Sequence, residues 1–595
     1  MGRGGPSLDS RSRGRRLPES LWQNRRVLPQ RQPSGRTAFL AFLCLAFILR
    51  GAFYCVEQPI WEGYDEWAHF AYIQYIAEHH RLPERTDRVS GEVRRSLDLV
   101  PLSSSAAEAV HGALTHDAFW RLPLPERLRR EREFRKLNPE CKNPDAGEQS
   151  LLQYEAQQPP LYYLLLTLPY LAVKGFPLPA RVLILRVISL SISAAALPLA
   201  YGIARRVAAA RRIAILIPVL LASFSGLLID VCCVGNDSLA IVAGSAAVLG
   251  AVRLAGRRYR RADWMIFGTI LTAALLTKAY FLAFVPLVPL LAAMQGLRKR
   301  ATAGQAITGC GLALGIVALG AGWWYAHAWA VTGTLSGEML DAATAGLRGK
   351  LGAVWQVRWW RVLDTAAFTH IWTGGWSFLG VRSWMYRVFE TFAVAAAAGV
   401  IALTARMILN AARRRIFPDD AARFAAVAGA YLLIVLGIGY FTLGAFLATG
   451  LSVGIGWYLY AAVSAEMVLL AAGFTGLAGV RRAGGCAALL CLLALAFDLY
   501  TMHFVLAPYY TGLIGHRPNG SLGAFRIGAL ADAGMRGICA RLSVNKGPSI
   551  GPAVVAAVWA GYVSATGALM MFSAAQLYRA AFSRNLISRG GPSKS

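Results

Sequence analysis

The stretch TAFLAFLCLAFILRGAFYCV, residues 37–56, is almost wholly apolar and long enough to cross a bilayer as one helix. Similar apolar runs recur through most of the 595 residues, of which 56% are hydrophobic and 16% charged, with a mean hydropathy of +0.44. A typical soluble domain carries roughly 25% charged residues. The composition therefore predicts an all-α polytopic membrane protein and excludes an ordinary soluble enzyme, a disordered protein and a coiled coil.

The net charge of +29 and the pI near 10.2 would fit nucleic-acid binding only if the charge formed a patch on one folded face. Residues 57–157 instead carry 18 Asp or Glu and 13 Lys or Arg. The positive excess therefore lies elsewhere, in short clusters between apolar runs, as in cytoplasmic loops under the positive-inside rule. We expect a membrane and no nucleic acid as partner.

Loop charge also decides between two topologies, which differ in whether the short apolar run Pro159–Val173 crosses the membrane. If it crosses, the later basic clusters fall outside; if it lies at the membrane surface as a juxtamembrane helix, they all fall inside. The second arrangement is favoured. It predicts about 12 spans, at residues 37–56, 182–203, 213–230, 237–254, 263–278, 281–296, 305–328, 387–410, 422–446, 453–479, 485–506 and 552–577.

Residues 263–296 are expected to form a tight hairpin, because a single tilted helix would invert every later loop. Each arm of about 16 residues would be roughly 24 Å long, short of the ~30 Å hydrocarbon core. The tip, Thr277-Lys278-Ala279-Tyr280, is therefore expected within the outer leaflet.

We expect the chain to divide into four parts. These are a disordered basic cytoplasmic tail at 1–36, a first module at 37–300 with the outer loop 57–157, a second module at 301–577 with outer loops 329–386 and 507–551, and a basic cytoplasmic tail at 578–595. Both termini are then cytoplasmic. Abundant Arg, Ala and Gly suggest a GC-rich bacterial genome, and hence a bacterial inner membrane.

Candidate chemistry begins just beyond the first span, with the adjacent carboxylates Asp65 and Glu66. The sequence after Asp65 reads as a helix, in which Glu66 and His69 are neighbours one turn apart. Carboxylates are favoured at a helix N-terminus, so capping is the simpler interpretation. Their position at the membrane face favours a base that can reach a substrate there.

Two further residues stand out. Asp237 follows Asn236 at the outer end of a later span, where it is either part of a helix cap or a second acid facing the same cavity as Asp65. Lys278 is one of only eight lysines, against 53 arginines, and it interrupts the apolar hairpin. A cation there indicates function unless it snorkels to the interface, and it would be well placed to bind a lipid phosphate.

Two aromatic segments have both a simple and a functional interpretation. The second long outer loop holds, among basic residues, Trp355, Trp359, Trp360, Trp372, Trp376 and Trp384. They fit an aromatic belt or a lid that stacks on sugar and holds phosphate. In Gln157-Gln158-Pro159-Pro160-Leu161-Tyr162-Tyr163 the prolines fix the entry into a helix and the tyrosines suit the interface.

Five features follow one another along the chain: the acidic pair after the first span, the Pro-Pro-Leu-Tyr-Tyr segment, a basic turn after the second span, Asn-Asp opening a later span, and Thr-Lys in a short hairpin. Their order resembles that in the polytopic GT-C glycosyltransferases. The chain looks most like bacterial relatives of the dolichyl-phosphate-mannose protein mannosyltransferases and the lipid A aminoarabinose transferases. The likeness covers roughly residues 37–300, and the rest is similar in general architecture.

The resemblance implies transfer of a sugar from a polyprenyl-phosphate-type lipid donor to a glycan, lipid or protein acceptor on the outer face. It implies that Asp65 is the general base, assisted by Glu66, that Lys278 binds the donor phosphate, and that Asp237 is a second cavity acid. Candidate substrate contacts are His69, Gln158, Tyr162, Arg358 and His370. Many relatives have His where this chain has Gln157 and Gln158.

No cofactor is certain. Some relatives use a divalent metal, for which Asp65, Glu66, His69 and Asp237 would be the ligands, and the need for a metal stays open. Two other functions fit the topology: a transporter or lipid flippase, and a polymerase that joins lipid-linked polysaccharide units. Transporters often show inverted repeats and broken helices, which the sequence does not show clearly. A scaffold would leave Lys278 and the acidic pair unexplained.

Overall fold

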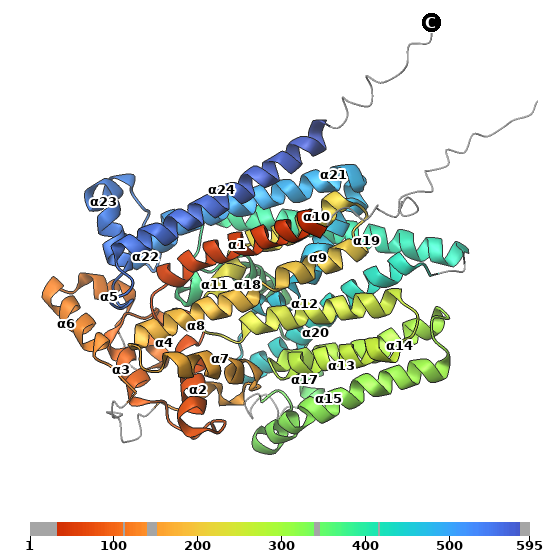
Figure 1. Ribbon diagram of the computed structural model, residues 1–595, viewed down its shortest axis with the longest axis horizontal. Coiled ribbons are helices and arrows are strands. Elements are labelled where there is room, and N and C mark those ends of the chain that lie inside the picture. The colour runs from red at the N-terminus through yellow and green to blue at the C-terminus, as the bar shows by residue number, and fades with distance from the viewer. Residues whose placement is uncertain (1–32, 111–113, 140–150, 338–345, 415–416, 583–595) are drawn as a thin grey trace, which may run out of the picture.

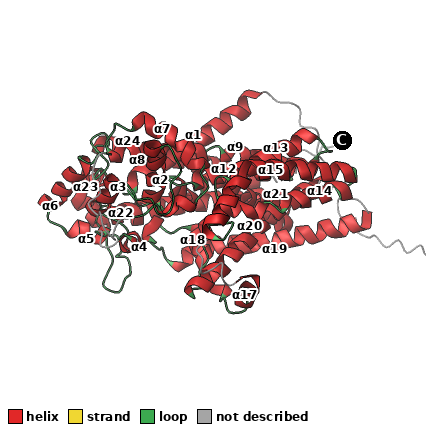
Figure 2. Ribbon diagram, turned by 90° about the horizontal axis from the view of Figure 1, so that it is seen from below, coloured by secondary structure: helices red, strands yellow, loops and turns green. Residues whose placement is uncertain are grey.

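A computed structural model describes residues 33–110, 114–139, 151–337, 346–414 and 417–582 (Figure 1). Residues 1–32 and 583–595, which make up most of the two expected tails, lie outside these ranges. The described residues form helices and no sheet, with three isolated bridges between extended residues (Figure 2). The all-α fold expected from the composition is confirmed.

The long helices form one bundle. They are α1 (Pro33–Glu57), α8 (Leu178–Ser193), α9 (Ala196–Val207), α10 (Arg211–Ser223), α11 (Ser225–Val231), α12 (Asp237–Gly256), α13 (Arg261–Leu275), α14 (Leu287–Leu297), α15 (Ala303–Thr332), α19 (Ser383–Arg414), α20 (Asp419–Thr449), α21 (Val463–Thr501) and α24 (Pro552–Phe582).

Shorter helices lie in the long loops and at helix junctions. They are α2 (Glu66–His79), α3 (Gly91–Leu99), α4 (Ser104–Ala109), α5 (His116–Arg121), α6 (Leu124–Arg135), η1 (Tyr154–Gln157), α7 (Leu161–Val173), η2 (Ala279–Phe284), α17 (Gly346–Ala353), α18 (Trp359–Ile371), η3 (Gly375–Ser377), η4 (Gly456–Ala462), η5 (Met502–Leu506), α22 (Ala507–Tyr510) and α23 (Ile527–Leu542).

The number of spans differs from the expected 12, which is not confirmed. In the described part of the chain, nine helical stretches are long and apolar enough to cross a membrane, and the pair α10 and α11, bent by 56°, would make ten. Helix α13 has only 15 residues. The stretch Gly456–Tyr510 is counted as one candidate span, although two were expected there and Gly479, with a φ of 75°, interrupts α21. Hydropathy marks these segments, but their lengths and breaks decide how many cross.

The hairpin expected over residues 263–296 is present as α13, η2 and α14. The backbone N–H of Tyr259, before α13, donates to the carbonyl of Arg300, after α14, at 3.1 Å. Both flanks therefore lie at the same end of the bundle. At 1.5 Å per residue α13 is roughly 22 Å long, much shorter than the 30-residue α15 against which it packs.

Helix α7 covers the run that loop charge placed at the membrane surface. Its 13 residues are too few to cross a bilayer, and it packs mainly against α2. The N–H of Leu161 donates to the carbonyl of Leu276 at 2.9 Å, which ties the start of α7 to the tip of the hairpin. The length agrees with a juxtamembrane helix.

The bundle has two unlike ends. At one, here called the basic end, Arg298 and Arg300 both pair with Asp419, and the charges of Arg253, Arg257 and Arg423 act on Arg206. At the other, the loop end, helices α2 to α6, α22 and α23 gather (Figure 1). Helix α12 connects the two, because it begins at Asp237 and ends beside Arg257.

A buried ion pair joins four helices inside the bundle. Arg50 of α1 and Asp498 of α21 are both 0% exposed, with 2.7 Å between the guanidinium nitrogen and the carboxylate oxygen. Asp498 also accepts hydrogen bonds from Tyr54 (2.5 Å) and from Tyr562 of α24 (2.8 Å). Arg50 donates to the carbonyl of Ala222 in α10. Every member of this cluster has a partner, so it fixes the register of the helices.

We predict that Asp498→Ala lowers the free energy of unfolding by about 3–5 kcal/mol, because the charge of Arg50 would stay buried without a partner. Thermal unfolding in detergent measures this. Asp98→Ala is the matched control, since Asp98 pairs with Arg94 at the surface and its side chain is half exposed. Equal unfolding temperatures for the two variants would contradict the prediction.

Candidate functional site

Four ionisable side chains from separate parts of the chain meet at the loop end. Asp65 precedes α2, Glu155 lies in η1, Asp237 opens α12, and Lys278 precedes η2. The charges of the other three all act on Glu155. Tyr458 of η4 lies over Lys278, with the ammonium 5.3 Å from its ring centroid. The sequence predicted three of these four charged residues.

Lys278 is held by Asp237. Its ammonium lies 2.5 Å from each carboxylate oxygen, and the hydroxyl of Tyr280 donates to the same carboxylate at 3.3 Å. Helix α13 ends at Leu275, and the extended backbone of Lys278 turns its side chain toward the start of α12. The ammonium is also 5.4 Å from the ring of Tyr280, a cation–π distance. Lys278 is thus buried and preorganised, with 8% of its surface exposed.

Asp65 has no such partner. Its backbone is left-handed (φ 50°, ψ 24°), and its side chain does not cap α2. The carboxylate is partly exposed and makes no hydrogen bond within the described ranges. Burial raises the pKa of Asp65 to about 7, and the positive charge of Lys278 opposes that shift. A carboxyl with this pKa is close to balanced between base and acid at neutral pH.

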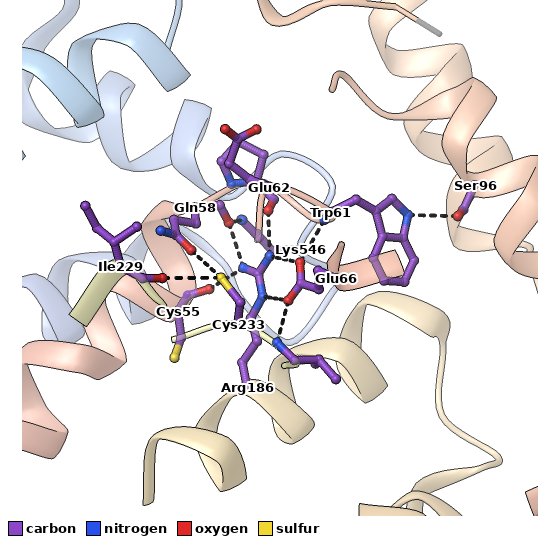
Figure 3. A network of polar contacts seen from close by, with 12 residues as sticks. Cys55, Gln58, Trp61, Glu62, Glu66, Ser96, Arg186, Ile229, Cys233 and Lys546 are labelled. Carbon is purple, nitrogen blue, oxygen red and sulfur yellow. Dashed lines mark hydrogen bonds and ion pairs between the residues drawn. The ribbon is translucent and has the colours of Figure 1, made fainter. Parts of the chain in front are cut away.

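Glu66 lies apart from Asp65, although the two are adjacent in sequence. The guanidinium of Arg186 in α8 binds both of its carboxylate oxygens, at 2.7 and 2.6 Å (Figure 3). The backbone N–H groups of Val234 and Trp61 donate to it at 2.9 and 3.0 Å. Glu66 and Arg186 are both 0% exposed. The structure therefore gives Glu66 a role in holding α2 in place.

The wall beside Asp65 is aromatic and hydrogen-bonded. The Nδ1 of His69 lies 2.8 Å from the hydroxyl of Tyr163, and the amide of Asn236 donates to the same hydroxyl at 3.4 Å. That amide also donates to the side-chain oxygen of Gln158, at 3.3 Å. Burial, together with the charge of Lys278, lowers the pKa of His69 to about 3. His69 is therefore neutral, and Gln158 is the more accessible of these groups.

Tyr162 is fully buried and has a supporting position. Its hydroxyl pairs with Ser189 at 2.7 Å and accepts from the N–H of Gly235 at 3.0 Å, which ties α7 to α8 and to the turn before α12. The prediction that Tyr162 contacts substrate has no support in this geometry.

Glu155 was not predicted from the sequence. It lies four residues before Pro159, in a short 3₁₀ turn, and only 3% of its surface is exposed. Its Oε2 is 3.9 Å from the Nδ1 of His69. Burial and the negative charge of Asp65 raise the pKa of Glu155 to about 8. A single carboxylate in a polar 100-residue loop gives no signal, and only the fold brings it to Asp65.

The residues considered as metal ligands do not fit that role. Glu66 is fully engaged by Arg186, Asp237 by Lys278, and His69 by Tyr163. Among the described residues no group of three or more His, Cys, Asp or Glu is arranged to hold a metal ion. We therefore derive no step through a metal.

The two predicted contacts from the second long loop lie in different surroundings. The Nε2 of His370 in α18 pairs with Glu466 of α21 at 2.8 Å, and its Nδ1 lies 3.1 Å from the carbonyl of Gly456. Burial lowers the pKa of His370, but Glu466 more than offsets this, so the net shift is upward. Arg358 is exposed at the start of α18. Neither contacts the Asp65 cluster.

The three long loops meet at Glu62, just before Asp65. Ser377 of the second loop and Tyr510 of the third donate to Glu62 Oε1, at 2.5 and 2.9 Å. His116, within the first loop, lies 2.7 Å from Oε2. Two residues further on, Tyr64 stacks on Trp457 with 4.4 Å between ring centroids. The site is thus enclosed by segments from both halves of the chain.

A scan of family models finds no match to this chain, and a search of curated proteins finds no relative. Among solved structures, one match is ArnT from Cupriavidus metallidurans, crystallised with undecaprenyl phosphate. It is 12% identical, covers 73% of this chain and 71% of its own, and has a TM-score of 0.36.

A second match is the archaeal oligosaccharyltransferase AglB from Archaeoglobus fulgidus, in complex with an inhibitory peptide and a dolichol-phosphate. It is 14% identical with a TM-score of 0.35, and the match spans 91% of this chain but only 56% of that one. At these TM-scores neither likeness carries an argument, so the chemistry has to follow from the site.

We predict that only one of the two adjacent acids, Glu66, is needed for stability. Glu66→Ala leaves Arg186 buried without a partner and is expected to lower the free energy of unfolding by about 3–5 kcal/mol. Asp65→Asn is expected to leave it nearly unchanged, since Asn tolerates the left-handed backbone. Thermal unfolding of the purified variants checks this. Equal destabilisation by both would show that Asp65 is also structural.

Proposed function

We propose that this protein is a membrane glycosyltransferase that moves a sugar from a polyprenyl-phosphate-type lipid to an acceptor hydroxyl. The observation that carries the proposal is a partly exposed, unpartnered carboxylate, Asp65, beside a buried cation, Lys278. A base and a fixed positive charge are what displacement at a sugar C1 by a hydroxyl needs when the leaving group is a phosphate. The GT-C resemblance of the sequence agrees with this.

In the proposed reaction Asp65 removes the proton of the acceptor hydroxyl. The acceptor oxygen then forms a bond to C1 of the sugar, while the bond from C1 to the phosphate oxygen breaks. The electron pair of that bond leaves with the lipid phosphate, and Lys278 stabilises the new charge. Attack on the face opposite the phosphate inverts the configuration at C1.

Asp237 prepares Lys278 for this role. Because both carboxylate oxygens lie 2.5 Å from the ammonium, the lysine side chain has one position before the donor arrives. A preorganised charge need not reorganise when the leaving group develops its own. We propose that the phosphate shares the ammonium with Asp237, which makes Asp237 a positioning residue.

The surroundings favour a lipid-linked donor over a soluble one. Lys278 lies at the tip of a hairpin whose first arm, α13, has only 15 residues, most of them apolar. An arm of this length that starts at one membrane surface does not reach the other. Its tip then lies just inside the second leaflet, close to the lipid headgroups. A phosphate anchored by a polyprenyl chain reaches that depth without leaving the membrane.

We propose that the loop end faces the outer side of a bacterial inner membrane, with both termini in the cytoplasm. The basic clusters gather at the opposite end, and positively charged loops stay cytoplasmic. The division into modules at residues 37–300 and 301–577 stays a prediction. The acceptor is a glycan, a lipid or a protein.

We predict that Asp65→Asn slows transfer by about 10²–10⁴-fold, the usual contribution of a general base. Lys278→Ala should cost about 10²–10³-fold through lost stabilisation of the leaving group. The assay is release of polyprenyl phosphate from radiolabelled polyprenyl-phosphate sugars by protein in nanodiscs. Asp98→Asn is the control. Movement of intact labelled lipid between leaflets, with no release in any sample, would instead favour a flippase.

We predict an acid limit to the rate. Asp65 acts only when ionised, and its pKa is raised to about 7, so transfer should fall by about tenfold for each pH unit below 7. The measurement is the rate of release between pH 5.5 and 8, with folding checked at each pH. A rate that is constant over this range would rule out Asp65 as the base.

A further inference from the structure

Glu155 occupies the back of the site, and the mechanism above leaves it without a role. Its Oε2 is buried and has no hydrogen-bond partner in the described part of the chain. The backbone N–H of Gln158 donates to the Glu155 carbonyl at 2.9 Å, so a tight turn holds the residue in place just before α7. A buried carboxyl oxygen without a partner is costly unless a proton or a ligand satisfies it.

The groups that face this carboxyl come from six elements. They are Asp65 and the α2 residues His69 and Tyr72, Tyr154 on its own turn, Tyr163 of α7, Asp237 of α12, Lys278 before η2, and Tyr458 of η4. Lys278 is the one cation among them, and its ammonium is already bound by both carboxylate oxygens of Asp237. His69 is neutral. Lys278 and the side chain of Gln158 favour a negative charge on Glu155, but burial and the charges of Asp65 and Asp237 outweigh them, so the pKa of Glu155 is raised.

We propose that Glu155 is a further catalytic residue: its carboxyl stays protonated and donates a hydrogen bond to the phosphate of the lipid donor beside Lys278. This role rests on the proposed glycosyltransferase function. The proton remains on Glu155 throughout, so the balance of the transfer reaction is unchanged. The hydrogen bond strengthens as the phosphate gains charge when its bond to C1 breaks.

Charge balance in the site supports a neutral Glu155. The Lys278–Asp237 pair has no net charge, ionised Asp65 contributes one negative charge, and the arriving phosphate contributes at least one more. A further carboxylate, in a pocket with little water, would repel the phosphate. A protonated carboxyl attracts it instead.

Burial explains why the two carboxyls take different roles. Asp65 is partly exposed to water, whereas Glu155 is 3% exposed, so a proton shared between them favours the more buried group. Burial raises the pKa of both carboxyls, to about 7 for Asp65 and about 8 for Glu155. One carboxyl is thus available as the base while the other stays an acid.

The test compares Glu155→Gln and Glu155→Ala, with Glu84→Gln as the matched control, since Glu84 is exposed in the same loop. The probe is undecaprenyl phosphate, bound to protein in nanodiscs at pH 7 and pH 9.5. In the wild type, binding is expected to weaken at least about tenfold at pH 9.5. Glu155→Gln keeps a donor and cannot ionise, so it should lose clearly less affinity between pH 7 and pH 9.5 than the wild type, and the remaining loss comes from the ionisation of Asp65. Glu155→Ala should bind at least about tenfold more weakly already at pH 7.

Two results would overturn the role of Glu155. One is a Glu155→Ala variant that binds as tightly as the wild type at pH 7. The other is a Glu155→Gln variant with the same loss at pH 9.5 as the wild type. Failure of the proposed function is distinguishable, because the wild type itself would then neither bind the lipid phosphate nor release it from a polyprenyl-phosphate sugar.

Discussion

The buried ion pair between Glu66 and Arg186 is the interaction on which the site depends. Arg186 lies in the middle of α8, and through Glu66 it fixes the first turn of α2 against the bundle and against the turn that leads into α12. The same guanidinium donates to the carbonyls of Cys55, Gln58 and Pro59 (Figure 3). Because Arg186 holds Glu66, the adjacent Asp65 is fixed where the charge of Lys278 acts on it.

Charge is divided along the bundle in a way that suits catalysis at one end. At the basic end Arg298 and Arg300 pair with Asp419, whereas the loop end holds carboxylates, the buried lysines Lys278 and Lys546, and many tyrosines. In the low dielectric of that pocket each charge acts strongly on its neighbours. In the proposed reaction the phosphate binds beside the preorganised Lys278, and the acceptor hydroxyl lies at the carboxylate of Asp65. The chemistry thus follows from few groups in fixed positions.

Much of this could be predicted from sequence, for identifiable reasons. Hydropathy and loop charge gave the helical class, the hairpin at Lys278 and the short helix at Tyr162, since apolar length and arginine position are local properties. Asp65, Asp237 and Lys278 stood out because each interrupts or opens an apolar segment. The structural role of Glu66 could not be predicted, because its partner Arg186 is 120 residues away in the sequence. Glu155 carries no local signal, and the number of spans depends on breaks such as Gly479 that hydropathy does not show.

The central claim is that a lipid phosphate binds at Lys278, next to Asp65. A cryo-electron microscopy structure of the full chain in nanodiscs with undecaprenyl phosphate tests it most directly. The account predicts density for the phosphate within hydrogen-bond distance of the Lys278 ammonium, with the polyprenyl chain running into the membrane beside the short hairpin. Phosphate density elsewhere on the protein, with the Lys278–Asp237 pair closed and Asp65 facing an empty pocket, would contradict it.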